Sequence, residues 1–105
     1  MLSRRARVTT SLFNEAITSR NIVSTPYATL RVLPHGSARC AIVVSKKVAK
    51  SAVVRNRIKR QVSHILRAIK LPTAIILIFI KPSYIGADRA QIIKSFTDIV
   101  PKIKV

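Results

Sequence analysis

The chemistry that this sequence offers most clearly is the binding of phosphate groups by cationic side chains. Residues 45–70 include many basic residues and no acid. The basic residues of this stretch are Lys46, Lys47, Lys50, Arg55, Arg57, Lys59, Arg60, Arg67 and Lys70. Solvated helix faces usually mix charge signs, because opposite charges four residues apart stabilise a helix. A stretch of one sign repels itself unless phosphates neutralise it, so we predict a nucleic-acid-binding surface here.

Other kinds of site have little support in the residue types. The acids are only Glu15, Asp88 and Asp98, and their spacing does not suggest a carboxylate pair. The two histidines, His35 and His64, fall on different expected elements, and a single cysteine makes no metal cluster. Two glycines cannot build a glycine-rich phosphate loop. We therefore predict no catalytic residues and no metal ligands in the protein itself.

The composition indicates one small, strongly basic domain. The chain has 105 residues, of which 49% are hydrophobic, enough for a single core over residues 1–105. Its net charge of +17 favours a polyanionic partner. Nucleic acid is the first candidate and an anionic membrane the second. Residues 1–10 are polar and basic, and we interpret them as a flexible arm that is either solvated or in contact with phosphate.

The sequence predicts neither a membrane span nor export. The longest apolar run, Ala74–Ile80, is far shorter than the roughly 20 residues needed to cross a bilayer. The N-terminal segment lacks the long apolar region of a secretory signal, although its Arg-rich and Ser/Thr-rich composition is also that of a transit peptide. Cys40 has no partner for an internal disulfide, which suits a reducing compartment, and we expect it to be a small core residue. We expect a cytoplasmic protein with no membrane association.

A helix over residues 52–70 is expected to position the cations. Ser51 is the expected N-cap, and Pro72 ends the helix. Large apolar residues recur at the spacing of one helix face, which predicts the side that packs on a core. These apolar residues are Val54, Ile58, Val62, Ile65, Leu66 and Ile69. The residues expected on the opposite, polar side are Asn56, Lys59, Arg60, Ser63, Arg67 and Lys70.

The remaining pattern predicts an α+β fold. The other expected elements are a helix at 11–19, a loop at 21–26, and strands at 27–33, 38–44 and 74–80. A last helix is expected to begin after Asp88 as its N-cap. Its apolar stripe consists of Ile92, Ile93, Phe96, Ile99 and Val100. The first two strands are expected to pair antiparallel through the turn between them, and the third to be buried on both faces. The order α-β-β-α-β-α predicts a mixed sheet with helices packed on it.

The basic stretch resembles the signature of the bacterial ribonuclease P protein component. That signature reads K-K-x(4–5)-A-V-x-R-N-x-x-K-R-x-x-R-E-x-x-R. The matching residues of this chain are Lys46, Lys47, Ala52, Val53, Arg55, Asn56, Lys59, Arg60 and Arg67. The apolar strands on either side and the order of the elements also fit the family, whereas the N-terminal third matches only loosely.

The resemblance implies the protein subunit of a ribonucleoprotein that removes the 5′ leader from precursor tRNA. In that family the RNA and its Mg²⁺ ions do the chemistry, and the protein adds affinity for the RNA and the substrate. The implied partners are ribonuclease P RNA and precursor tRNA, with no obligate protein partner inferred. The implied fold is a small two-layer α/β sandwich, in which the basic helix links two parallel strands by a left-handed crossover, against the usual right-handed rule. The residues predicted to contact the RNA are Lys46, Lys47, Lys50, Arg55, Asn56, Arg57, Lys59, Arg60 and Arg67, with Arg55, Asn56, Lys59 and Arg60 bearing most of the contact.

The family also binds the single-stranded leader in a cleft between the sheet and the first helix. Phe13 and Ile17 occupy helix positions where the family has aromatic residues, and Tyr27 lies in the strand that lines the cleft. Stacking on an unpaired base contributes about 1–3 kcal/mol. Ile17 cannot stack, and Phe13 suits core packing equally well, so Tyr27 is the main candidate. In the basic stretch, Ser63 and His64 replace an Arg-Glu pair of the family, so we expect one phosphate contact to be missing.

Two other functional classes share the size or the charge. A structural ribosomal-type RNA-binding protein would be equally small and basic, but it does not require the R-N-x-x-K-R string. A basic membrane-surface protein would expose large apolar residues opposite its charges, whereas the apolar side of this helix has a sheet to pack on.

Overall fold

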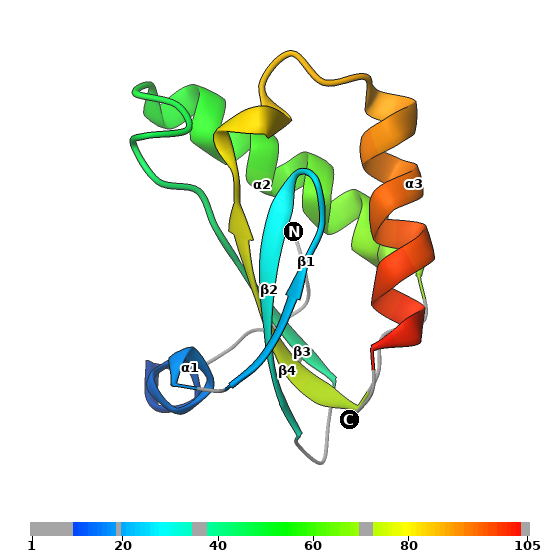
Figure 1. Cartoon of the computed structure of the whole chain (residues 1–105). Helices are drawn as coiled ribbons and strands as arrows, with labels where there is room; N and C mark the ends of the chain where they lie inside the picture. The colour runs from blue at the N-terminus through cyan, green and yellow to red at the C-terminus, as the bar shows by residue number, and fades with distance from the viewer. Residues whose placement is uncertain (1–9, 19, 35–37, 70–72, 104–105) are drawn as a thin grey trace.

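The computed structural model describes residues 10–18, 20–34, 38–69 and 73–103. Its helices and strands are α1 (Thr10–Ile17), β1 (Asn21–Ser24), β2 (Ala28–Pro34), β3 (Arg39–Val43), α2 (Ala52–Arg67), β4 (Ala74–Ile80) and α3 (Arg89–Ile99). Short 3-10 helices follow β4 and α3, at Pro82–Tyr84 and Val100–Lys102. The predicted α+β class with a mixed sheet is confirmed (Figure 1). Within the described residues, no helix is both long enough and apolar enough to cross a membrane.

The sheet has the strand order β1-β2-β4-β3, which corrects two sequence predictions. The predicted loop at residues 21–26 contains β1, which pairs antiparallel with β2. Strand β1 has four residues and is mostly exposed, so it shows no alternating pattern that sequence reasoning could detect. The predicted hairpin of β2 with β3 is also wrong, because β4 lies between them, antiparallel to β2 and parallel to β3.

Strand β4 takes the central place because its side chains are apolar on both faces, and this burial was predicted correctly. Ile76 and Ile78 lie in the larger core cluster, which includes residues of α2 and α3. Ile75 and Leu77 lie in a smaller cluster with Ala16 of α1. Figure 1 shows the same arrangement, with α1 on one side of the sheet and α2 and α3 on the other. The sheet and its two larger helices thus form the main sandwich, and α1 covers part of the second face.

Helix α2 links β3 to its parallel neighbour β4, which is the crossover connection that the resemblance implies. The two strands are in register with Ile42 opposite Ile78. The connection therefore lays α2 across the face of the sheet that holds the larger core cluster. The left-handed sense of this crossover stays a prediction.

Helix α3 begins and packs as its sequence predicts. The carboxylate of Asp88 accepts a hydrogen bond from the backbone N–H of Ala90 at 3.1 Å, and so caps the helix. Ile92 and Phe96 of the predicted stripe are buried, whereas Ile93 is exposed. The apolar stripe is therefore narrower than predicted, and it holds α3 on the same face of the sheet as α2.

Cys40 is buried, as predicted, and burial raises the pKa of its thiol to about 12. Because the thiolate is the reactive form, we expect iodoacetamide at pH 8 to leave the folded protein unmodified and to alkylate the chain in denaturant, as measured by mass spectrometry. In the unfolded chain the thiol loses its proton near its ordinary pKa of 9, whereas the folded protein keeps it. The contribution of this thiol to stability is therefore present below pH 9 and is lost as the pH rises toward 12. Equally fast alkylation of the folded and unfolded chains would contradict the burial of Cys40.

Candidate nucleic-acid interface

The basic residues are built on α2, whose apolar side is buried against the sheet. Ile58, Val62 and Leu66 are each at most 3% exposed and belong to the larger core cluster. Their burial sets the rotation of the helix, so the opposite side must face solvent. Ser51 precedes the first helical residue as predicted, but its hydroxyl makes no capping hydrogen bond. The helix ends at Arg67, earlier than predicted.

Exposed cations gather on and just before α2. We define the basic face as the residues Lys46, Lys47, Lys50, Asn56, Lys59, Arg60 and Arg67. All of them are exposed except Lys59, which is half-buried. No acid occurs in residues 38–69, since Glu15 lies in α1, Asp88 caps α3 and Asp98 lies near its end. The positive charge of this face is therefore not neutralised by neighbouring residues of α2.

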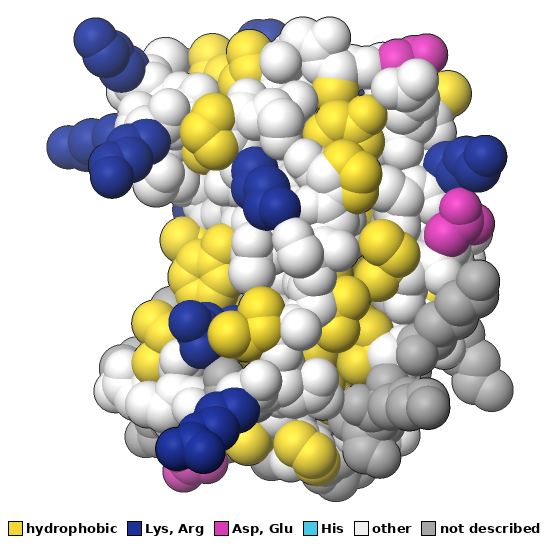
Figure 2. All heavy atoms as spheres, in the orientation of Figure 1, with side chains coloured by type: hydrophobic (Ala, Val, Ile, Leu, Met, Phe, Trp, Pro, Cys, Tyr) yellow, Lys and Arg dark blue, Asp and Glu magenta, His cyan; other side chains and the backbone are white. Residues whose placement is uncertain are grey.

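A turn before α2 presents the first lysines. The amides of Val48 and Ala49 donate hydrogen bonds to the carbonyl of Ser45 at 3.1 and 3.3 Å. The side chain of Val48 is buried in the larger core cluster, which holds the turn against the protein. Figure 2 shows Lys and Arg side chains projecting from this end of the molecule, where the chain passes from β3 to α2. Lys46 and Lys47 are therefore displayed on an anchored turn.

Arg55 has a structural role that was not predicted. Its Nη1 donates hydrogen bonds to the carbonyls of Ala49 at 3.0 Å and Lys50 at 2.8 Å. These bonds tie the first turn of α2 to the lysine turn before it. Arg55 therefore positions the lysines, and one of its nitrogens is already engaged. Its contact with RNA stays a prediction.

Ser63 is buried although it falls on the predicted polar side of α2, which corrects the expectation that it is exposed. Its side chain is 5% exposed. Helical rotation places Ser63 about 20° from Asn56 and about 40° from Arg67, so its burial comes from residues that cover it and not from its position around the helix. Asn56, Arg60 and Arg67 lie within about 40° of one another on this side and stay exposed. An exposed polar row therefore runs along α2 although position 63 carries no cation.

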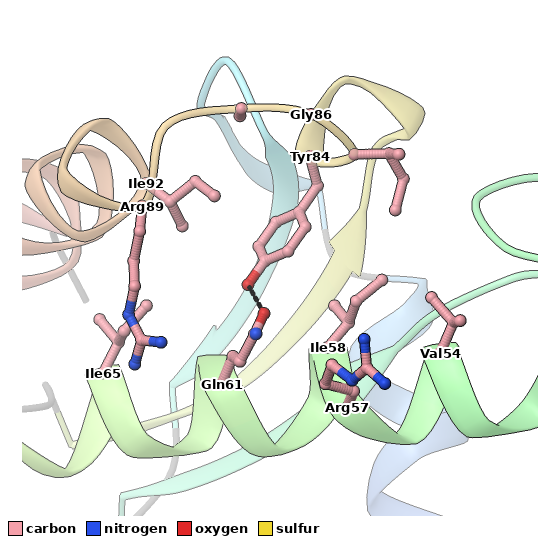
Figure 3. Close-up of a pocket in the computed structure, with 11 residues that line it drawn as sticks. Val54, Arg57, Ile58, Gln61, Ile65, Tyr84, Gly86, Arg89 and Ile92 are labelled. Atoms are coloured by element: carbon pink, nitrogen blue, oxygen red, sulfur yellow. Dashed lines mark hydrogen bonds between the residues drawn. The ribbon is translucent and has the colours of Figure 1, made fainter.

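Arg57 lies on the other flank of α2, which faces the start of α3. It lines an open hollow with Arg60, Gln61, His64 and Arg89. Sequence reasoning missed Arg89, because nothing in the periodicity of either helix indicates which residues meet between them. Beside this hollow the hydroxyl of Tyr84 donates to Oε1 of Gln61 at 2.9 Å (Figure 3). Burial raises the pKa of Tyr84, and the positive charge of Arg89 lowers it by a smaller amount.

A separate groove lies on the opposite face of the sheet, beside α1. It has a volume of about 240 Å³ and is lined by Ile17, Thr29, Arg31 and Phe79. Ile17 of α1 therefore borders a groove between this helix and the inner strands β2 and β4. Phe79 was not predicted here, although its alternation with Ile75 and Leu77 along β4 indicates the face toward α1. The side chain of Phe13 lies outside the described residues.

Tyr27 does not join this groove, which corrects its assignment to the cleft. Its hydroxyl donates to Oε1 of Gln91 in α3 at 3.0 Å, and its ring packs against the larger core cluster. Strand alternation predicts that Tyr27 shares a face with Thr29 and Arg31. However, β2 begins at Ala28, so Tyr27 belongs to the preceding turn and the alternation does not apply to it. Among the described residues that line the groove, the aromatic one is Phe79.

No group of three or more His, Cys, Asp or Glu side chains is arranged to hold a metal ion in the part of the chain that the structure describes. The row of positive charges along the basic face instead supports contacts with an extended anion that carries several phosphates. The basic face and the groove beside α1 lie on different parts of the molecule. They are thus two separate candidate surfaces.

Comparison with known proteins gives a family match over nearly the whole chain. The family model described as Ribonuclease P matches residues 2–104. The ribonuclease P protein component of Thermus thermophilus is 42% identical over 78 residues, which cover 74% of this chain and 45% of that protein. The corresponding protein of Thermus oshimai is 43% identical over 76 residues, covering 72% of this chain and 50% of that protein. The chain spans about half the length of these curated relatives.

Solved structures share the fold. The RNase P protein from Thermotoga maritima superposes with a TM-score of 0.81 at 20% identity, covering 94% of this chain and 98% of that chain. A Staphylococcus aureus RNase P protein mutant with defective mRNA degradation activity gives a TM-score of 0.82 at 20% identity, covering 93% and 87%. At this level of identity the likeness concerns the fold alone.

Proposed function

Because this chain belongs to the ribonuclease P protein family, we propose that it is the protein subunit of a ribonuclease P ribonucleoprotein. The resemblance drawn from the signature is thereby confirmed at the level of the family. In our proposal the protein binds the catalytic RNA and the 5′ leader of precursor tRNA. The RNA, with its Mg²⁺ ions, hydrolyses the bond that releases the leader. The protein raises the affinity of the complex for its substrate.

The basic face is the observation that supports RNA binding. Cations that neutralise phosphates release condensed counterions, which supplies most of the sequence-independent affinity for nucleic acid. The 16 residues of α2 give it a length of about 24 Å, enough to meet several phosphates. Arg60 and Arg67 point outward along this length, and the lysine turn extends the row beyond the start of the helix. Since core packing holds α2, the helix that carries the row is fixed in place before RNA binds.

The groove beside α1 supports contact with the leader. A single-stranded segment exposes unpaired bases, which stack on aromatic rings, and phosphates, which pair with guanidinium groups. Phe79 supplies a partly exposed ring, and Arg31 supplies a guanidinium group in the same groove. Thr29 adds a hydroxyl between them. We therefore assign the leader to this groove, with Phe79 in the role first given to Tyr27.

The test is precursor tRNA cleavage by a bacterial ribonuclease P RNA at low Mg²⁺, with and without this protein. We expect the protein to increase the rate of 5′-leader removal. The increase should be larger for a precursor with a leader of several nucleotides than for one with a single-nucleotide leader, because only the longer leader reaches the groove. A gel assay with end-labelled precursor measures both rates.

The same assay separates the proposal from a ribosomal-type structural role. Binding to the RNA without any increase in cleavage would favour that alternative. An equal increase for the long and short leaders would retain the subunit role and overturn the assignment of the groove.

A further inference from the structure

We propose that Arg57 of α2 and Arg89 of α3 form a second RNA phosphate site, which adjoins the basic face at Arg60. This second site rests on the proposed function, since it assumes the same RNA partner. It adds a contact from α3, an element without a role in the proposed RNA contacts. The site lies on the flank of α2 that faces the start of α3.

The two arginines border one hollow between α2 and the segment that leads into α3. This hollow has a volume of about 250 Å³, and its wall includes Tyr84, Gln61 and Gly86. Figure 3 shows the guanidinium groups of Arg57 and Arg89 on either side of the hydrogen-bonded pair of Tyr84 and Gln61. Both arginines are exposed, whereas Tyr84 is buried. The hydrogen-bonded side chains of Tyr84 and Gln61 thus form the bottom of the hollow, and the two arginines lie at its edge.

The charge of this region is not balanced by neighbouring acids. The adjoining open hollow adds Arg60 and His64 to the same two arginines, and no acid is among the described residues that line either hollow. Asp88, which caps α3 through the amide of Ala90, precedes Arg89 in the chain, and its single negative charge is outnumbered by Arg57, Arg60 and Arg89. Two guanidinium groups facing one hollow repel each other, and a phosphate between them removes that repulsion through charge-assisted hydrogen bonds.

The dimensions favour part of a polynucleotide over a free small molecule. The hollow beside Tyr84 and Gln61 measures about 250 Å³, less than the roughly 300–1,000 Å³ of pockets that enclose small ligands, and the adjoining hollow of about 400 Å³ is open to solvent and does not enclose one. It is also continuous in charge with the basic face, because Arg60 belongs to both regions. An RNA strand that contacts Arg60 therefore reaches Arg57 without leaving the protein surface. A second copy of this chain is a poor occupant, since each copy has a net charge of +17.

The backbone beside the site leaves room for the nucleoside attached to that phosphate. Gly86 has a φ of +80°, and a side-chain carbon added there would meet no atom within 4 Å. Ile85 next to it is 49% exposed and lines the same hollow. A ribose or an unpaired base would cover this apolar surface while the phosphate pairs with the arginines. The site thus fits a nucleotide of a single strand or of a helix end.

The test compares Arg89→Gln and Arg57→Gln with Lys94→Gln in binding to a bacterial ribonuclease P RNA transcript. Lys94→Gln removes the same charge from an exposed position of α3 that does not line the hollow. We expect each arginine variant to weaken binding about four- to fivefold at 0.15 M salt and to reduce the slope of log affinity against log salt by about one unit. Lys94→Gln should change the affinity less than about twofold, because it loses only a screened long-range attraction.

Arg67→Ala, on the basic face and outside this hollow, separates the two proposals. If it weakens binding while Arg89→Gln and Arg57→Gln behave like Lys94→Gln, the second site is overturned and the proposed function stands. If Arg67→Ala is also without effect, the basic face itself fails as the RNA contact.

A position-specific probe gives a second readout. A hydroxyl-radical-generating iron chelate attached through Ile85→Cys should cleave the bound RNA at a discrete site, since the buried native Cys40 is not expected to react with the label. The same chelate attached through Ile22→Cys, exposed on β1, is the control. Absence of discrete cleavage from Ile85→Cys, in a complex that forms normally, would place the RNA away from α3.

Discussion

Replacing Arg60 and Arg67 together by alanine is expected to weaken binding to ribonuclease P RNA about 20-fold at 0.15 M salt. Both side chains are exposed on the same side of α2, where no acid competes for them. Each lost phosphate contact reduces affinity about four- to fivefold at this salt concentration, and the two losses multiply. The salt slope should fall by about two units. Filter binding over a range of salt concentrations measures both quantities.

The control for this variant removes two charges elsewhere. Arg20→Ala combined with Lys94→Ala lowers the net charge equally but leaves the basic face intact. It should retain most of the affinity. The Arg60 and Arg67 variant should also melt at the wild-type temperature, because neither side chain is part of the core. Equal losses of affinity in the two double variants would show that only net charge matters, and would remove the specific role of the basic face.

Replacing Phe96 by alanine is expected to lower the free energy of unfolding by about 3–5 kcal/mol, the usual cost of deleting a buried aromatic ring. Phe96 has no exposed surface and belongs to the larger core cluster, with residues of the sheet and of α2. Small domains have a total stability of only about 5–15 kcal/mol. The melting temperature should therefore fall by at least about 12 °C, as measured by circular dichroism.

Ile93→Ala is the matched control on the same helix. Ile93 is 39% exposed and lies off the buried side of α3, so we expect it to cost less than about 1 kcal/mol. Urea denaturation of the two variants gives the comparison directly. A loss below 1 kcal/mol for Phe96→Ala would mean that α3 does not pack on the sheet as described. The Arg57–Arg89 site depends on that packing and would then lose its structural basis.

Much of this protein was predictable because it depends on residues that are neighbours in the chain. The periodicity of residues 54–66 predicts which side of α2 is buried, and its charges predict the opposite side. Asp88 predicts the start of α3, since capping involves only the next few residues. The apolar run of β4 predicts burial on both faces. The ordered signature on α2 predicts the family, since the order of residue types along one segment needs no knowledge of the fold.

Tertiary structure alone decided which segments meet. Pairing of β4 with both β2 and β3 depends on contacts between residues far apart in the chain, so the predicted hairpin was wrong. The exchange of Tyr27 for Phe79 has a similar cause, because the side-chain direction of a residue next to a strand end depends on what packs beside it. Ser63 lies on the polar side of α2 by helical rotation but is buried, because tertiary packing covers it.

The cationic chemistry itself was determined by the sequence. Residue types establish an acid-free row of lysines and arginines, and helical periodicity establishes that the row is exposed. The structure decided how these cations are divided. It assigned Arg55 to hold the lysine turn, and it placed Arg57 beside Arg89, which lies 32 positions further along the chain. Such a pairing arises only when the crossover and the chain after β4 bring two helices together on one sheet, and no local pattern contains that information.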